Sequence, residues 1–181
     1  DMKDPEYQAS SADEFRILDL REMDDCREAV QGMDEVYNLA ADMGGIGYIS
    51  GAHAPITYNN TMISAQMLKA AYDAKIERFL FSSSCSLYGA APGDDFLDEN
   101  AAFNPVTPYG ESKLLVENDL RELADDDFSP TYLRNATAYG VSPRHRVDLV
   151  LNNLVGWAVT TGRIHLMSDG TPWRPMVHVE D

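Results

Sequence analysis

The sequence predicts an α/β fold with a doubly wound parallel sheet, and two observations lead to it. Runs of β-type residues alternate with stretches of helical length along the chain, which is the pattern of parallel strands joined by crossover helices. The 181 residues, 44% of them hydrophobic, are enough to bury one sizeable core. In such a sheet, ligands bind beyond the carboxyl ends of the strands.

The first half of the chain predicts strands at 15–19, 34–41 and 78–82. The second of these is an apolar run that ends in small residues, and the third leads directly into hydroxyl side chains. Helices are predicted between the strands, at 23–31 and 60–74, and the longer one carries apolar side chains at helical spacing. This half therefore alternates strictly between strand and helix.

The second half continues the alternation with a helix at 108–123, a strand at 130–135 and a helix at 149–161. A β-rich stretch at 164–179 follows. The segment 90–108 is rich in proline, glycine and acidic residues, and we interpret it as a loop on the substrate side.

Charge and cysteine content exclude several classes of partner. Thirty acidic and 14 basic side chains give a formal net charge of −16, which repels nucleic acid and anionic membranes. Cys26 and Cys85 are too few for a disulfide framework and lack zinc-ligand spacing. No signal peptide or membrane-spanning run is recognisable. We predict a cytoplasmic protein with no metal, no nucleic-acid partner and no membrane partner.

Three side chains point to proton-transfer chemistry. Tyr109 and Lys113 are four residues apart on a predicted helix, so they share one face and can reach a common ligand. Ser84 follows the strand at 78–82, at the edge where ligands bind in such a sheet. A plain surface pair is the alternative reading of the Tyr–Lys spacing. The serine at the strand end favours the catalytic reading.

The run Ser-Ser-Ser84-Cys-Ser-Leu-Tyr-Gly89, followed by Pro-Tyr109-Gly-Glu-Ser-Lys113, resembles the extended short-chain dehydrogenases/reductases that act on nucleotide sugars. The resemblance covers nearly the whole chain, and the N-terminal half is most similar to the GDP-mannose 3,5-epimerases of that family. It implies a Rossmann-type sheet, NAD as cofactor and a nucleotide-diphosphate sugar as substrate. It also implies that the first strand, the phosphate loop and the first helix are missing from these 181 residues.

By this resemblance, Ser84, Tyr109 and Lys113 form the catalytic set. A free phenol has a pKa near 10, but a nearby cation favours the phenolate, which can take the proton of a sugar hydroxyl. Ser84 would hold the same oxygen, while Lys113 would also anchor the nicotinamide ribose. The product of this step is a transient keto-sugar.

The residues after Ser84 bear on the choice of reaction. The family's 3,5-epimerases carry an acid/base cysteine at the position of Ser86, whereas Cys85 lies one position too early. The 4,6-dehydratases carry acidic residues at both positions. A hydroxyl at Ser86 suits a 4-epimerase, which needs no second base. We favour 4-epimerisation, with 3,5-epimerisation or dehydration as alternatives and a non-catalytic scaffold as an alternative of another class.

The cofactor contacts implied by the resemblance lie along the first half of the chain. Asp1 falls where the family's strand-terminal acid binds the adenosine ribose, which would select NAD over NADP. Two further segments would contact the adenine and the pyrophosphate, with small residues where backbone approaches the ligand; they comprise Asp19, Leu20, Leu39, Ala40 and Ala41. For Asp19, a helix N-cap is the alternative reading.

On the substrate side, the resemblance assigns Ser84, Ser86, Asn153 and Arg174, the last two to the nucleotide diphosphate, for which an arginine fork is suited. It implies an NAD-binding domain over 1–140, a partial substrate-binding region over 141–181, and a homodimer. Because no glycine-rich phosphate loop is present, we expect the 181 residues alone not to bind NAD tightly.

Overall fold

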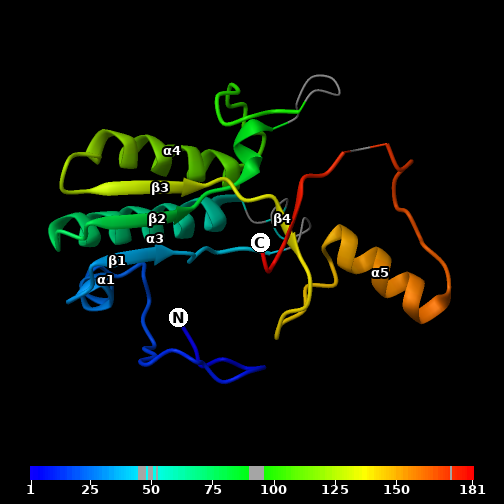
Figure 1. Cartoon of the computed structure of the whole chain (residues 1–181), viewed down its shortest axis with the longest axis horizontal. Coiled ribbons are helices and arrows are strands. Elements are labelled where there is room, and N and C mark those ends of the chain that lie inside the picture. Colours follow the sequence, from blue (N-terminus) through cyan, green and yellow to red (C-terminus); the bar gives the residue numbers. More distant parts are fainter. Residues whose placement is uncertain (45–47, 49–50, 52, 90–95, 172) are drawn as a thin grey trace. The chain divides into compact units, whose positions relative to one another are not determined.

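The computed structural model describes residues 1–44, 48, 51, 53–89, 96–171 and 173–181 (Figure 1). The chain divides into two compact units. Unit 1 comprises residues 1–4 and 10–134, and unit 2 comprises residues 5–9 and 135–181.

Unit 1 contains a three-stranded parallel sheet in the order β1-β2-β3, formed by β1 (Glu35–Asn38), β2 (Arg78–Ser82) and β3 (Ser129–Leu133). The three arrows point the same way in Figure 1. Pairing of Asn38 with Phe81, and of Ser82 with Leu133, brings the carboxyl ends of all three strands to one edge. The predicted parallel α/β sheet is therefore confirmed.

Among the residues that the structure describes, three α-helices pack with this sheet: α1 (Met23–Val30), α3 (His53–Asp73) and α4 (Pro108–Leu123). The core between helices and strands is made of fully or almost fully buried apolar side chains, among them Phe79 and Phe81 of β2. Burial of side chains of this size is the main stabilising contribution to such a unit. The core thereby holds α4 against the strand ends.

Several predicted elements agree closely with the structure. The strand 78–82 and the helix 108–123 have the predicted bounds, and α1 ends one residue before the predicted Gln31. The helix predicted at 60–74 begins earlier, at His53, with Pro55 in its first turn. Proline is tolerated there because the first N–H groups of a helix have no intrahelical acceptor.

The strand predicted at 15–19 is wrong. This segment is not part of any sheet; Leu18 donates its N–H to the carbonyl of Asp1, and the amino group of Asp1 donates to the carbonyl of Arg16. Two backbone bonds to a single residue do not make a strand ladder. The short 3₁₀ helix η1 (Cys85–Tyr88) was not predicted from the sequence.

Unit 2 contains a parallel strand pair, β4 (Thr137–Tyr139) and β5 (Met176–His178), and the helix α5 (Val150–Thr161). The helix agrees with the predicted 149–161 within one residue. Among the described residues of the β-rich stretch 164–179, only those of β5 form a strand, and β4 was not predicted. None of the helices that the structure describes has the length and apolar character needed to cross a membrane.

Candidate active site

The carboxyl end of β2 leads into η1 through three consecutive serines. Ser84 has an extended backbone and caps η1, because its Oγ accepts a hydrogen bond from the N–H of Ser86 at 3.1 Å. The same hydroxyl donates to the Oγ of Ser86 at 2.9 Å. Ser84 is 8% exposed, so the sequence-predicted hydroxyl is held at the strand edge by local bonds.

The start of α4 lies directly against η1. Thr107 caps the helix by accepting from the N–H of Gly110 at 3.1 Å, and Pro108 occupies the first turn, where it is favoured. A Cβ atom on Gly110 would lie 3.0 Å from the carbonyl oxygen of Ser86 and 3.1 Å from Cβ of Pro105. The absence of a side chain at Gly110 therefore permits this close approach.

Lys113 is buried on the same helix, with 2% exposure. Its Nζ donates to the carbonyl oxygen of Ser82 at 2.8 Å and lies 4.6 Å from the ring centroid of Phe81 and 5.6 Å from that of Tyr109. Burial lowers the pKa of Lys113 from 10.5 to about 8. Near neutral pH the ammonium form still predominates, so a cation lies beside Tyr109.

Tyr109 differs from the expectation of a depressed pKa. Burial raises the pKa of its phenol, while a hydrogen bond with Ser84 lowers it by less and the neighbouring Cys85 adds to the rise. Desolvation therefore outweighs the hydrogen bond with Ser84 in setting the pKa of this phenol. The structure nevertheless brings Ser84, Tyr109 and Lys113 together, as the sequence predicts.

The two residues that distinguish the candidate reactions, Cys85 and Ser86, lie in η1. Cys85 is half-buried, and desolvation by burial raises the pKa of its thiol. A thiol in the protonated form is a poor nucleophile and a poor base. Ser86 presents its hydroxyl to Ser84, at the position where the resemblance placed a second functional group.

The predicted cofactor residues lie before α1 and after β1. Leu20 packs against the core and Leu39 is exposed, while Ala40 and Ala41 are half-buried. Asp19 accepts three side-chain hydrogen bonds and one backbone hydrogen bond from Arg21, which lower its pKa to about 2. The N-cap of α1 is Glu22, so the alternative reading of Asp19 as a cap is wrong.

The other predictions for this edge have different outcomes. Asp1 is exposed and accepts a bond from its neighbour Met2, so the selection of NAD over NADP stays a prediction. Residues 90–95 of the predicted substrate-side loop lie outside the described residues.

The loop after Ala41 is fixed by contacts that the sequence did not reveal. The N–H of Asp42 donates to Oδ1 of Asn60 at 2.7 Å, and Nδ2 of Asn60 donates back to the carbonyl of Asp42 at 3.0 Å. Nδ2 of Asn59 donates to the Asp42 carboxylate at 2.8 Å. Two neighbouring asparagines of α3 thus hold the small residues of this loop at the strand edge.

The small side chains and the hydrogen-bond donors of this edge fit NAD. Small side chains at Ala40 and Ala41 allow a ligand to approach the backbone. Lys113 has three N–H donors, one of which is used by Ser82, so the ammonium can also donate to a ribose hydroxyl. Tyr109 lies beside it, where a reacting hydroxyl would be positioned.

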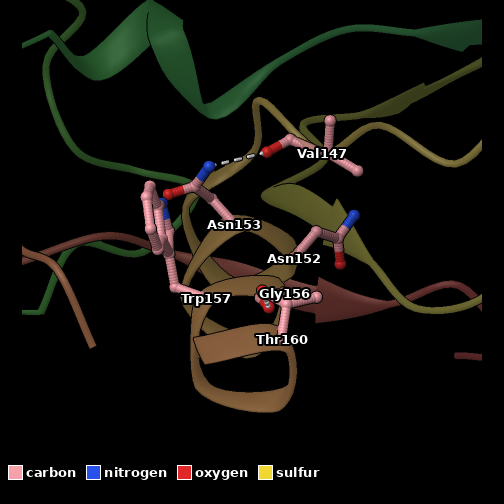
Figure 2. Close-up of a pocket in the computed structure, with 6 residues that line it drawn as sticks. All are labelled: Val147, Asn152, Asn153, Gly156, Trp157 and Thr160. Carbon is pink, nitrogen blue, oxygen red and sulfur yellow. Dashed lines mark hydrogen bonds between the residues drawn. The ribbon is translucent and has the colours of Figure 1, made fainter. Parts of the chain in front are cut away.

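Unit 2 carries the two remaining predicted residues. Asn153 donates from Nδ2 to the carbonyl of Val147 at 3.0 Å and lines a cavity of about 240 Å³ (Figure 2). Its other lining residues are Val147, Asn152, Gly156, Trp157 and Thr160. Arg174 is exposed before β5 and is not among the lining residues. The structure therefore does not group Asn153 with Arg174 in one pocket.

Comparison with known proteins places this geometry in a family. The chain matches the NAD dependent epimerase/dehydratase family over residues 2–181. It is 47% identical to the GDP-mannose 3,5-epimerase of Arabidopsis thaliana over 111 residues, which cover 58% of this chain and 29% of that protein. It is 30% identical to the UDP-glucose 4-epimerase of Bacillus subtilis over 142 residues, 68% of this chain and 42% of that protein.

A solved structure gives the same result. The UDP-glucuronic acid 4-epimerase of Bacillus cereus, determined with UDP-glucuronic acid and NAD, superposes with a TM-score of 0.72 at 28% identity. The match covers 86% of this chain and 49% of that protein, so the chain spans half or less of the length of these relatives. Since the family match extends over almost every residue, the chain belongs to the NAD-dependent epimerase/dehydratase family.

Proposed function

We propose that the full-length protein containing this chain epimerises a nucleotide-diphosphate sugar at a single carbon, C4, with NAD as cofactor. The observation that carries this proposal is the meeting of Ser84, Tyr109 and Lys113 at the carboxyl edge of the sheet. The Ser84 hydroxyl lies close enough to Tyr109 to lower the pKa of its phenol, and the buried ammonium of Lys113 lies 5.6 Å from the Tyr109 ring centroid.

In the proposed reaction, Tyr109 takes the proton of a sugar hydroxyl whose oxygen is also held by the Ser84 hydroxyl. Lys113 favours the phenolate form of Tyr109 and donates to a ribose hydroxyl of the cofactor. The chemistry that bound NAD supplies is reversible hydride transfer at the sugar carbon, and return to the opposite face inverts that centre. Burial of Lys113 keeps bulk water away from its ammonium.

Inversion at one carbon requires no second acid/base group, and η1 supports this choice. Burial raises the pKa of the Cys85 thiol, and Ser86 offers a hydroxyl where a 3,5-epimerase of this family carries its cysteine. A second candidate, 3,5-epimerisation of GDP-mannose, is favoured by the 47% identity to the Arabidopsis GDP-mannose 3,5-epimerase.

Product analysis by NMR in deuterated water separates these reactions. UDP-glucose and GDP-mannose are each incubated with the full-length protein and NAD. We expect inversion at C4 of UDP-glucose without deuterium in the product, because the hydride leaves and returns without exchange. Inversion of GDP-mannose at C3 and C5 with deuterium incorporated there would establish the second candidate instead. Binding of both ligands without any product would indicate the scaffold role.

The homodimer is part of the proposal. The family resemblance implies that two subunits pair through the helices that correspond to α3 and α4. An open cavity of about 590 Å³ on α3 supports an interacting surface; it is lined by His53, Ala54, Thr57, Tyr58, Thr61 and Met62. Light scattering of the full-length protein should give twice the mass of the monomer, and a monomeric mass would contradict the dimer.

A further inference from the structure

A buried ion pair lies behind the candidate catalytic residues, in a place where sequence analysis assigned no function. Glu117 is 0% exposed on α4, one helical turn after Lys113 and two turns after Tyr109, so the three share a face of the helix. Its carboxylate accepts a hydrogen bond from the hydroxyl of Ser83 and a bidentate set from Arg134, whose NH2 lies 2.8 Å from Oε2.

Arg134 connects this carboxylate to two further segments. The residue directly follows β3, and its NH1 donates to the Tyr88 hydroxyl in η1 and to the carbonyl of Glu99, both at 2.9 Å. Its guanidinium also lies 4.6 Å from the ring centroid of Phe103. The side chain is 13% exposed, so one arginine links α4, η1 and the loop before α4 in a mostly buried place.

Two residues of α4 hold two consecutive residues of the strand end. Lys113 binds the carbonyl of Ser82, and Glu117 binds the hydroxyl of Ser83. The next residue in the chain is Ser84. These bonds therefore fix the register between α4, which carries Tyr109, and the segment that carries the Ser84 hydroxyl.

The same pair also controls charge near Lys113. A carboxylate and an ammonium four residues apart on a helix attract each other. Glu117 is instead engaged by Arg134, and the ammonium of Lys113 is directed to Ser82. A buried carboxylate without a partner would be strongly unfavourable, so removal of Arg134 would drive Glu117 toward the nearest cation.

We propose that Glu117 and Arg134 are positioning residues for the epimerase reaction: together they set the geometry between Ser84 and Tyr109 and keep the Glu117 carboxylate away from Lys113. This inference rests on the proposed function for its catalytic part. Its structural part rests on the bonds from Ser83 and Arg134 to Glu117.

The other charged groups around Lys113 are few among the described residues. On α4 they are Tyr109, the exposed Glu111 and the buried Glu117, and η1 contributes the Cys85 thiol. Arg134 lies beyond Glu117, and on the neighbouring α3 the exposed pair Lys69–Asp73 is engaged with itself. Glu117 is therefore the carboxylate whose release would act on Lys113.

The test is the pKa of Lys113, measured in the full-length protein by NMR of labelled lysine side chains. This chain contributes four lysines, so the Lys113 signal is assigned by its loss in Lys113→Met. In Arg134→Met we expect the pKa of Lys113 to rise by about one pH unit or more, because an unpaired carboxylate favours the ammonium. In Glu117→Gln we expect it to fall, because Arg134 is left without its counter-charge.

The double variant Glu117→Gln/Arg134→Met removes both charges and should return the pKa of Lys113 close to its wild-type value. It also keeps the test decisive if Arg134→Met does not fold, since Glu117→Gln and the double variant then carry the comparison. The matched control is Asp24→Asn, which neutralises one partner of the exposed Arg27–Asp24 pair on α1 and should leave the pKa unchanged.

The second measurement is the steady-state turnover of the same variants. Both single variants should lower kcat about 10- to 100-fold with little change in KM, because displaced catalytic groups lose rate while ligand contacts remain. A Lys113 pKa that does not move, or that moves in the same direction in both single variants, would overturn the inference. The NMR arm needs no turnover, so an inactive wild-type protein would refute the proposed function and leave the structural part decidable.

Discussion

The two units of the chain differ in how far their functional side chains are buried. In unit 1, Ser84 and Lys113 are buried and bound to neighbouring protein atoms. In unit 2, Arg174 is exposed, Trp157 is 41% exposed, and no residue of α5 is buried. The groups proposed for proton transfer are therefore preorganised by the core, whereas the groups proposed for ligand contact are ordered mainly by local bonds.

The largest expected effect is on the chemistry of unit 1. Tyr109→Phe removes one hydroxyl and almost no volume, so kcat of the full-length protein should fall by about 10² to 10⁴-fold with thermal stability retained. The exposed Tyr37→Phe on β1 is the matched control and should leave kcat unchanged. If Tyr109→Phe keeps more than about a tenth of the wild-type rate, Tyr109 is not the base.

The free energy of unfolding should respond very differently to the same substitution in the two units. Leu120 is 0% exposed in the core of unit 1, whereas Leu166 of unit 2 is 51% exposed. Leu120→Ala should lower the free energy of unfolding by about 2–5 kcal/mol, and Leu166→Ala should change it by no more than about 0.5 kcal/mol. Denaturant unfolding measures both, and equal losses would contradict the contrast between the units.

The buried charge of Lys113 should make stability depend on pH. Below pH 8 both the folded and the unfolded chain carry the proton, so folding includes the full cost of burying the charge. As pH rises from about 8 toward 10.5, the folded chain loses the proton first and this cost disappears. Stability should therefore rise relative to Lys113→Met by on the order of 3 kcal/mol across this range.

That comparison is measured by unfolding both proteins at several pH values. Taking the difference removes shared contributions, such as that of Cys26, whose pKa is raised to about 11 by burial. A difference that stays constant between pH 7 and pH 11 would mean that Lys113 is not desolvated in the folded protein.

The smallest effect on the rate is expected for Cys85, although it lies in η1 next to Ser84. Cys85→Ala removes a thiol whose pKa is raised by burial, and 4-epimerisation gives that thiol no task. The rate should stay within about threefold of wild type, since no acid–base group is lost. A loss as large as that of Tyr109→Phe would instead support 3,5-epimerisation, and steady-state kinetics on both substrates would detect it.

Sequence reasoning located the elements whose signals are local. The apolar run of β2 and the Thr107–Pro108 start of α4 specify their own ends, and the Tyr109–Lys113 spacing places both side chains on one helix face. The segment 15–19 shows the opposite case. Its residues favour a strand, but a strand also needs a neighbour to pair with.

The unpredicted parts of the site depend on residues that are far apart in sequence. Arg134 lies 17 residues after Glu117, directly after β3, and no periodic pattern relates the two residues. Position alone could have indicated Glu117, because it continues the Tyr109–Lys113 face by one more turn. Its partner could be found only from the tertiary structure.

The first turn of α4 gives Tyr109 an electrostatic environment of its own. Tyr109 is the second residue of the helix, where the aligned peptide dipoles leave about half a positive elementary charge. This field opposes the effect of burial, because it lowers the energy of a phenolate, and it fades within one turn. A sequence change that started α4 one turn earlier would therefore leave the same tyrosine and lysine in contact and make the tyrosine a weaker acid.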